Sequence, residues 1–145
     1  MDTIVIIVVI FALVLASSFM KKKMDEGLID TGYKHISVAK AKEMMAKDDD
    51  HLIVDVRTKE EYDEGHVPGA INVPNERIFD IMPTELGKLD QTLLVYCRSG
   101  RRSREACSKL ARIGYTNVYN FGGIQDWDGD IEAEFIFSIW EKKEN

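Results

Sequence analysis

Cysteine is scarce in this chain of 145 residues, which contains only Cys97 and Cys107. Two cysteines are too few for a disulfide scaffold, and their spacing does not fit a zinc site, so we expect no metal. Free thiols fit a reducing compartment or a catalytic use. Basic residues are also outnumbered, because 19 Lys and Arg face 25 Asp and Glu, for a formal net charge of -6. This balance argues against a general nucleic-acid-binding protein.

Positive charge is missing in front of the first apolar run. Residues 3–20 carry no charge, follow only Met1 and Asp2, and precede Lys21 to Lys23. As a helix the run spans about 27 Å, close to the ~30 Å of a bilayer core. A signal peptide needs a basic stretch before the run, so we favour an uncleaved, single-pass membrane anchor with the following domain in the cytoplasm. The small residues "ASS" near position 17 leave open a cleaved signal and a secreted or periplasmic enzyme.

The rest of the chain has no internal repeat and no low-complexity segment, and its length allows one compact domain. We predict four parts: a transmembrane anchor at 1–20, a linker at 21–34, a globular domain at 35–131 and an apolar extension at 132–145. The extension is too apolar for a free tail. We expect it to pack on the domain, contact a partner or touch the membrane surface.

Strand-like and helix-like segments alternate through the globular part. Strands are expected at 35–37, 52–56, 70–74, 92–96 and 117–121, helices at 38–47, 58–65 and 103–114, and one or two helical turns within 75–89. Thr58 and Glu61 form a capping-box pattern at the start of one helix. The alternation predicts an α/β fold with a central parallel sheet covered by helices on both faces, preceded by one transmembrane helix.

One cysteine lies where a parallel sheet binds ligands. Cys97 follows the apolar strand 92–96 and precedes a helix, so it is expected at the carboxyl end of the sheet. Backbone N–H groups, the helix dipole and the arginines at 98, 101, 102 and 104 all favour a thiolate, which is the nucleophilic form. Cys107 shares a helix face with Leu110 and Ala111, which is core spacing.

The region 35–127 resembles a single-domain rhodanese, a sulfurtransferase. The resemblance rests on "DVRTKEEYDEGHVPGAINVP" (55–74), "VYCRSGRRS" (95–103) and "GYTNVYNFGGIQDW" (114–127). It implies that Cys97 takes a sulfane sulfur from a small anionic donor such as thiosulfate, forms a persulfide, and passes the sulfur to a thiol, a protein or another thiophilic acceptor, with no cofactor.

The resemblance also implies which residues surround that sulfur. The substrate cradle is the backbone of Arg98, Ser99, Gly100, Arg101, Arg102 and Ser103, with three of its arginines as candidates to bind the anionic donor. Two supporting residues are expected near the loop. Asp55 is expected to hydrogen-bond backbone, and Arg57 to pair with Glu60 or Glu61. His66 looks like a general base but is expected to be structural.

Two other functions fit parts of the same pattern. The chain could be a rhodanese-like interaction or sulfur-carrier module at the membrane, although the intact loop favours an enzyme. Cysteine-dependent phosphatases and arsenate reductases use a Cys-x5-Arg loop, which requires arginine at position 103. This chain has Ser103 there, and the shorter loop from Cys97 to Arg102 fits the rhodanese pattern.

Overall fold

The computed structural model describes residues 2–25, 31–47, 50–79 and 81–133. Contacts divide the chain into two units, residues 1–31 and 32–145. The predicted C-terminal extension lies almost wholly at 134–145, outside the described residues. What it contacts therefore stays a prediction.

The first unit contains one long helix, α1 (Thr3–Asp25). Apolar side chains are exposed all along its length. The stretch Thr3–Lys23 is long and apolar enough to cross a membrane, a property that membrane anchors and signal sequences share. The helix continues past residue 20, where the prediction ended it, because lysine and methionine are good helix formers and residues 21–25 include no glycine or proline.

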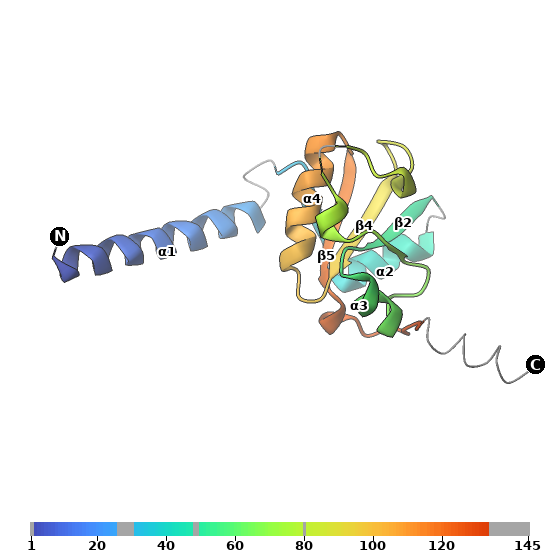
Figure 1. Ribbon diagram of the computed structural model, residues 1–145, viewed down its shortest axis with the longest axis horizontal. Helices are drawn as coiled ribbons and strands as arrows, with labels where there is room; N and C mark the ends of the chain where they lie inside the picture. The colour runs from blue at the N-terminus through green and yellow to red at the C-terminus, as the bar shows by residue number, and fades with distance from the viewer. Residues whose placement is uncertain (1, 26–30, 48–49, 80, 134–145) are drawn as a thin grey trace, which may run out of the picture. The chain divides into compact units, whose positions relative to one another are not determined.

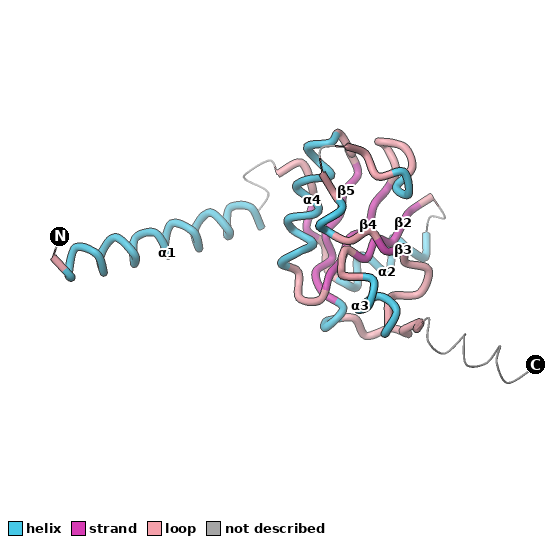
Figure 2. Tube along the Cα trace, viewed as in Figure 1, coloured by secondary structure: helices cyan, strands magenta, loops and turns pink. Residues whose placement is uncertain are grey.

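The second unit is an α/β domain built on a five-stranded sheet, as predicted (Figure 2). All strand pairs are parallel, and the strand order is β1-β5-β4-β2-β3. The strands are β1 (Lys34–His35), β2 (His51–Asp55), β3 (Ile71–Asn72), β4 (Thr92–Cys97) and β5 (Asn117–Gly123). Parallel pairing brings the carboxyl ends of β2, β4 and β5 to one edge of the sheet, where Cys97 lies.

Helices cover both faces of this sheet (Figure 1). The helix α4 (Arg101–Ile113) buries one face with Ala106, Cys107 and Leu110, and α2 (Val38–Lys47) buries Ala41 against the other. Side chains of a strand alternate between faces, so Val95 and Cys97 of β4 join the α4-side cluster while Leu94 and Tyr96 join the α2-side cluster. The predicted core role of Cys107 is confirmed, because its side chain is fully buried.

Most predicted elements are present, with shifted ends. The helix α3 (Lys59–Glu64) begins with the predicted capping box, in which the Thr58 hydroxyl accepts from the Glu61 N–H and the Glu61 carboxylate accepts from the Thr58 N–H. The predicted strand 70–74 is only two residues long. The segment 75–89 holds two 3-10 turns, η1 (Asn75–Arg77) and η2 (Thr84–Leu86), and each starts directly after a proline.

Candidate active site

Cys97 is the last residue of the central strand β4, and its side chain is buried against α4. The chain then turns through Arg98, Ser99 and Gly100 into the first turn of α4. Gly100 is the N-cap of α4 with φ of 98°, a left-handed conformation that glycine adopts without steric cost. The short loop therefore wraps its backbone around the cysteine sulfur.

Hydrogen bonds from this loop surround the sulfur. The Gly100 N–H donates to Cys97 Sγ over 3.1 Å, and Ser103 Oγ lies 3.6 Å from the same atom. Burial raises the pKa of the Cys97 thiol, but the Ser103 hydroxyl and backbone N–H groups of the loop lower it by more. The pKa therefore lies below its usual value. Because thiolate is the nucleophilic form, the arrangement favours attack by Cys97.

The sequence pattern attributed a lowered pKa to backbone N–H groups, the helix dipole and the arginines together. The hydrogen bonds that lower the Cys97 pKa come from the Ser103 hydroxyl and from the backbone N–H groups of Ser103, Gly100 and Ser99. Arg98 and Arg101 are exposed to solvent. Their side chains remain candidates for binding an anionic donor.

Arg102 pairs with Glu61, one of the two glutamates that were predicted to pair with Arg57. Its guanidinium donates twice to the Glu61 carboxylate of α3, over 2.7 and 2.8 Å. This bidentate geometry is the strongest form of an arginine–carboxylate pair. The hydrogen bond from Arg102 lowers the pKa of Glu61 to about 2. Glu61 thus joins the capping box of α3 to the first turn of the helix that follows Cys97.

The structure corrects the predicted partner of Arg57. Arg57 pairs with Asp55, not with Glu60 or Glu61, and its guanidinium donates to both carboxylate oxygens at 2.6 to 3.1 Å. The Tyr96 hydroxyl also donates to Asp55, over 2.7 Å. Asp55 accepts from the backbone N–H of Arg57, as expected for an acid at a strand end. Tyr96 belongs to the α2-side cluster, so this network braces the sheet edge on the face opposite Cys97.

His66 has structural contacts, as the sequence predicted. Its Nδ1 lies 2.8 Å from the Tyr62 carbonyl oxygen, and its ring stacks on that of Tyr62 with centroids 3.8 Å apart. Its backbone exchanges hydrogen bonds with Glu132 in an isolated antiparallel bridge. These contacts fix the end of the domain.

The loop after Cys97 rests on two glycines at the end of β5. A Cβ placed on Gly123 would lie 2.2 Å from the Arg98 carbonyl oxygen and 2.7 Å from the Ser99 Cα. The Arg98 carbonyl also accepts from the Gln125 N–H. The structure shows that Gly123 packs directly beneath the active-site loop.

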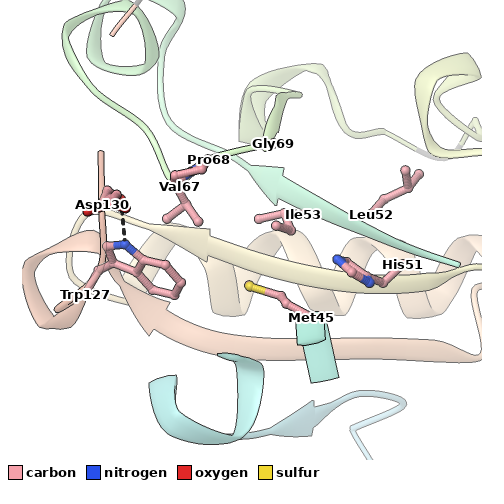
Figure 3. A pocket seen from close by; sticks show the side chains of 9 residues that line it. All are labelled: Met45, His51, Leu52, Ile53, Val67, Pro68, Gly69, Trp127 and Asp130. Carbon is pink, nitrogen blue, oxygen red and sulfur yellow. Dashed lines mark hydrogen bonds between the residues drawn. The ribbon is translucent and has the colours of Figure 1, made fainter. Parts of the chain in front are cut away.

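A pocket of about 440 Å³ lies on the other face of the sheet (Figure 3). Its walls include Met45 of α2, Ile53 of β2, Val67 and Trp127, all of which belong to the α2-side cluster. Trp127 is fixed there by a hydrogen bond from its indole N–H to the Asp130 carbonyl. Because Cys97 belongs to the α4-side cluster, this pocket does not hold a molecule that reacts at the cysteine.

The described part of the chain contains no candidate metal site. Among those residues, no group of three or more His, Cys, Asp or Glu side chains is placed to hold an ion.

Comparisons with known proteins agree with this geometry. A family model described as "Rhodanese-like domain" matches residues 37–130. The thiosulfate sulfurtransferase PspE of Escherichia coli K12 is 41% identical over 73 residues, which cover 50% of this chain and 70% of PspE. The thiosulfate sulfurtransferase GlpE of Pseudoalteromonas translucida is 34% identical over 97 residues, covering 66% of this chain and 90% of GlpE. A solved structure titled "rhodanese with anions from E. coli" is 36% identical with a TM-score of 0.53, covering 57% of this chain and 98% of that one.

Proposed function

The chain belongs to the rhodanese-like family, and from this premise we propose that it is a sulfurtransferase in which Cys97 carries the transferred sulfur as a persulfide. The observation that carries the proposal is the set of N–H and O–H donors around a buried sulfur of lowered pKa. Such donors stabilise a negative charge on sulfur both before and after it gains a second sulfur atom.

The reaction takes two steps that each conserve charge. The Cys97 thiolate attacks the outer sulfur of thiosulfate, the sulfur–sulfur bond of the donor breaks, and sulfite leaves with the bonding electron pair. A thiophilic acceptor, cyanide in an assay, then attacks the outer sulfur of the persulfide and returns Cys97 to the thiolate. Arg98 and Arg101, which are exposed, are the proposed contacts for the anionic donor.

The phosphatase alternative requires an arginine at position 103. The Ser103 side chain is fully buried, and its hydroxyl is hydrogen-bonded to Gly100 and Asn120. A guanidinium would not fit there without displacing these contacts. This supports sulfur transfer over phosphate-ester hydrolysis.

The test compares the two cysteines. Cys97→Ser is expected to abolish thiocyanate formation from thiosulfate and cyanide, because serine cannot hold the sulfur. Cys107→Ala, which removes a thiol from the core of the same helix, is the matched control and is expected to retain most of the activity. Comparable turnover in Cys97→Ser would rule out the assignment. If the unmodified protein took up one sulfur atom from thiosulfate but formed no thiocyanate, it would be a carrier module and not an enzyme.

We also propose that α1 anchors the enzyme in a membrane with its catalytic domain in the cytoplasm. Support comes from the position of Lys21 to Lys23, which directly follow the apolar run. If α1 is instead a signal sequence, the mature protein will lack the first twenty residues or so.

A further inference from the structure

The Ser103 hydroxyl has one hydrogen and four acceptors within reach. Its Oγ lies 2.9 Å from Asn120 Oδ1, 3.1 Å from the Gly100 carbonyl oxygen, 3.3 Å from the Gly122 carbonyl oxygen and 3.6 Å from Cys97 Sγ. Ser103 is fully buried and Asn120 is 2% exposed, so water does not replace a missing partner. The direction of this single hydrogen decides whether the sulfur has an O–H donor.

Two of the competing acceptors have a second donor. Asn120 Oδ1 accepts from the Gly122 N–H over 2.9 Å, and the Gly100 carbonyl accepts from the Arg104 N–H over 3.3 Å. When the Ser103 hydroxyl turns toward sulfur, neither oxygen is left without a hydrogen bond. This rotation of the hydroxyl therefore leaves neither of these two buried oxygens unsatisfied.

The orientation of the Asn120 amide follows from the same contacts. The Gly122 N–H requires an oxygen opposite it, so Oδ1 faces Ser103, and Nδ2 lies 3.4 Å from His35 Nδ1. The amide is thereby held with its acceptor toward the hydroxyl. An amide oxygen is neutral, so it competes for the hydrogen less strongly than a carboxylate would.

We infer that Asn120 is a positioning residue for the nucleophile, because it holds the Ser103 hydrogen while Cys97 is a thiol and releases it to the sulfur when Cys97 becomes a thiolate. In the thiol state the S–H donates to Ser103 Oγ and the Ser103 O–H donates to Asn120 Oδ1. On ionisation the thiol proton passes to solvent, and the Ser103 O–H turns to Sγ. This inference rests on the proposed function only in taking Cys97 as the reacting group.

Other groups also act on the sulfur and stay constant in the test. The Cys97 charge interacts with the Arg102 guanidinium and with the Cys107 thiol behind it in α4. Glu61 is held on Arg102, and His35 lies beyond the Asn120 amide. None of these side chains is altered by the substitutions below.

The experiment measures the Cys97 pKa by ultraviolet absorbance of the thiolate, with Cys97→Ser in each background as the blank. Asn120→Asp places a carboxylate against the Ser103 hydroxyl and is expected to raise the pKa by about one unit or more. The midpoint of the pH dependence of Cys97 alkylation is expected to rise by the same amount. Asn117→Asp is the matched control. It adds the same charge on β5 three residues before Asn120, about 10 Å along the strand and close to one Debye length, and is expected to leave the Cys97 pKa unchanged.

The coupling through the hydroxyl is tested in a second background. Ser103→Ala is expected to raise the pKa by itself, and Asn120→Asp is expected to add a smaller shift there than it does in the unmodified chain. An equal shift in both backgrounds would show that Asn120→Asp acts only by charge through space, which would overturn the inference.

A neutral variant covers the case in which Asn120→Asp does not fold, as judged by thermal unfolding. Asn120→Ala removes the competing acceptor, so the pKa is expected to stay constant or fall, and a rise would contradict the role. These readouts do not depend on turnover. Loss of thiocyanate formation with the expected pKa shifts would therefore refute only the proposed function.

Discussion

Replacing Gly123 with alanine is expected to displace the backbone of the loop that follows Cys97. The new Cβ would lie 2.2 Å from the Arg98 carbonyl oxygen, and ordinary contact begins at 3.4 Å, so the loop must retreat by about 1.2 Å. All three atoms that the Cβ meets belong to the backbone of Arg98 and Ser99, which cannot move aside as a flexible side chain can. The Gly100 N–H, now 3.1 Å from the sulfur, would be drawn out of hydrogen-bond range.

The size of the effect follows from the lost donor. A hydrogen bond to a charged group is worth ~1.5–3 kcal/mol, which corresponds to roughly a 10- to 150-fold fall in kcat/KM. The clash itself is expected to lower the free energy of unfolding by ~1–3 kcal/mol. Kinetics with thiosulfate and cyanide, the pH dependence of Cys97 alkylation and thermal unfolding together separate the two effects.

Gly69→Ala is the matched control for destabilisation without contact with the loop. Gly69 has φ of 77° and open space around its Cβ position, so alanine there costs ~1–2 kcal/mol of backbone strain. It is expected to lower stability while leaving the Cys97 pKa unchanged. If Gly123→Ala lowered stability by a similar amount and left alkylation and kcat/KM intact, the argument that β5 shapes the sulfur site would fail.

Four further outcomes are expected. Arg102→Ala should raise KM for thiosulfate, because it leaves the Glu61 carboxylate unpaired near the anion site, whereas Glu61→Gln should lower KM or leave it unchanged; the opposite order in steady-state kinetics would refute this. The Glu61 carboxylate has a lowered pKa in the folded state, so the stability that it contributes should be fully present above the ordinary pKa of 4.5 and lost as the pH falls from 4.5 toward about 2. Denaturant unfolding of the unmodified chain and of Glu61→Gln over this pH range measures the difference. Protein isolated from cells should carry a mass increase of one sulfur atom on Cys97, and finding it on Cys107 would contradict the assignment. A membrane-impermeant maleimide should not label Cys97 in intact cells, and the purified chain should begin at its first residues; labelling, or a mature chain starting near Phe19, would mean that α1 is a signal sequence.

The main elements of the domain could be predicted because local signals coincide with tertiary packing. The helix 38–47 was predicted with its observed ends, since its apolar spacing is helical and three aspartates follow it in the sequence. The strand of Leu93 to Val95 could be predicted because central parallel strands are apolar on both faces. The end of the sheet was harder to predict, since β3 is only two residues long and no local pattern marks where its pairing stops.

The position of Cys97 at the end of β4 could be predicted, and many of its contacts could not. Cys97 stands between a strand and a helix, which is a local pattern. The pairing of Arg102 with Glu61 joins residues 41 positions apart in the sequence, and no periodicity reports such a contact. The contribution of Asn120 depends on the register of β5 against β4, which is set by the whole sheet.

The length of the active-site loop and the path of its neighbouring strand are linked. Along the pair β4 and β5 the register runs from Val95 opposite Asn120 to Cys97 opposite Gly123, so β5 already contains one extra residue at this point. That offset places the Gly123 backbone against the Arg98 carbonyl. A graft that lengthened the loop by one residue, as a phosphatase-type loop would, leaves no space for the insertion unless β5 is redesigned as well. Conversion between these two chemistries on this scaffold therefore requires paired changes in two segments about twenty residues apart, and libraries that vary the loop alone would sample mainly variants with a damaged sulfur site.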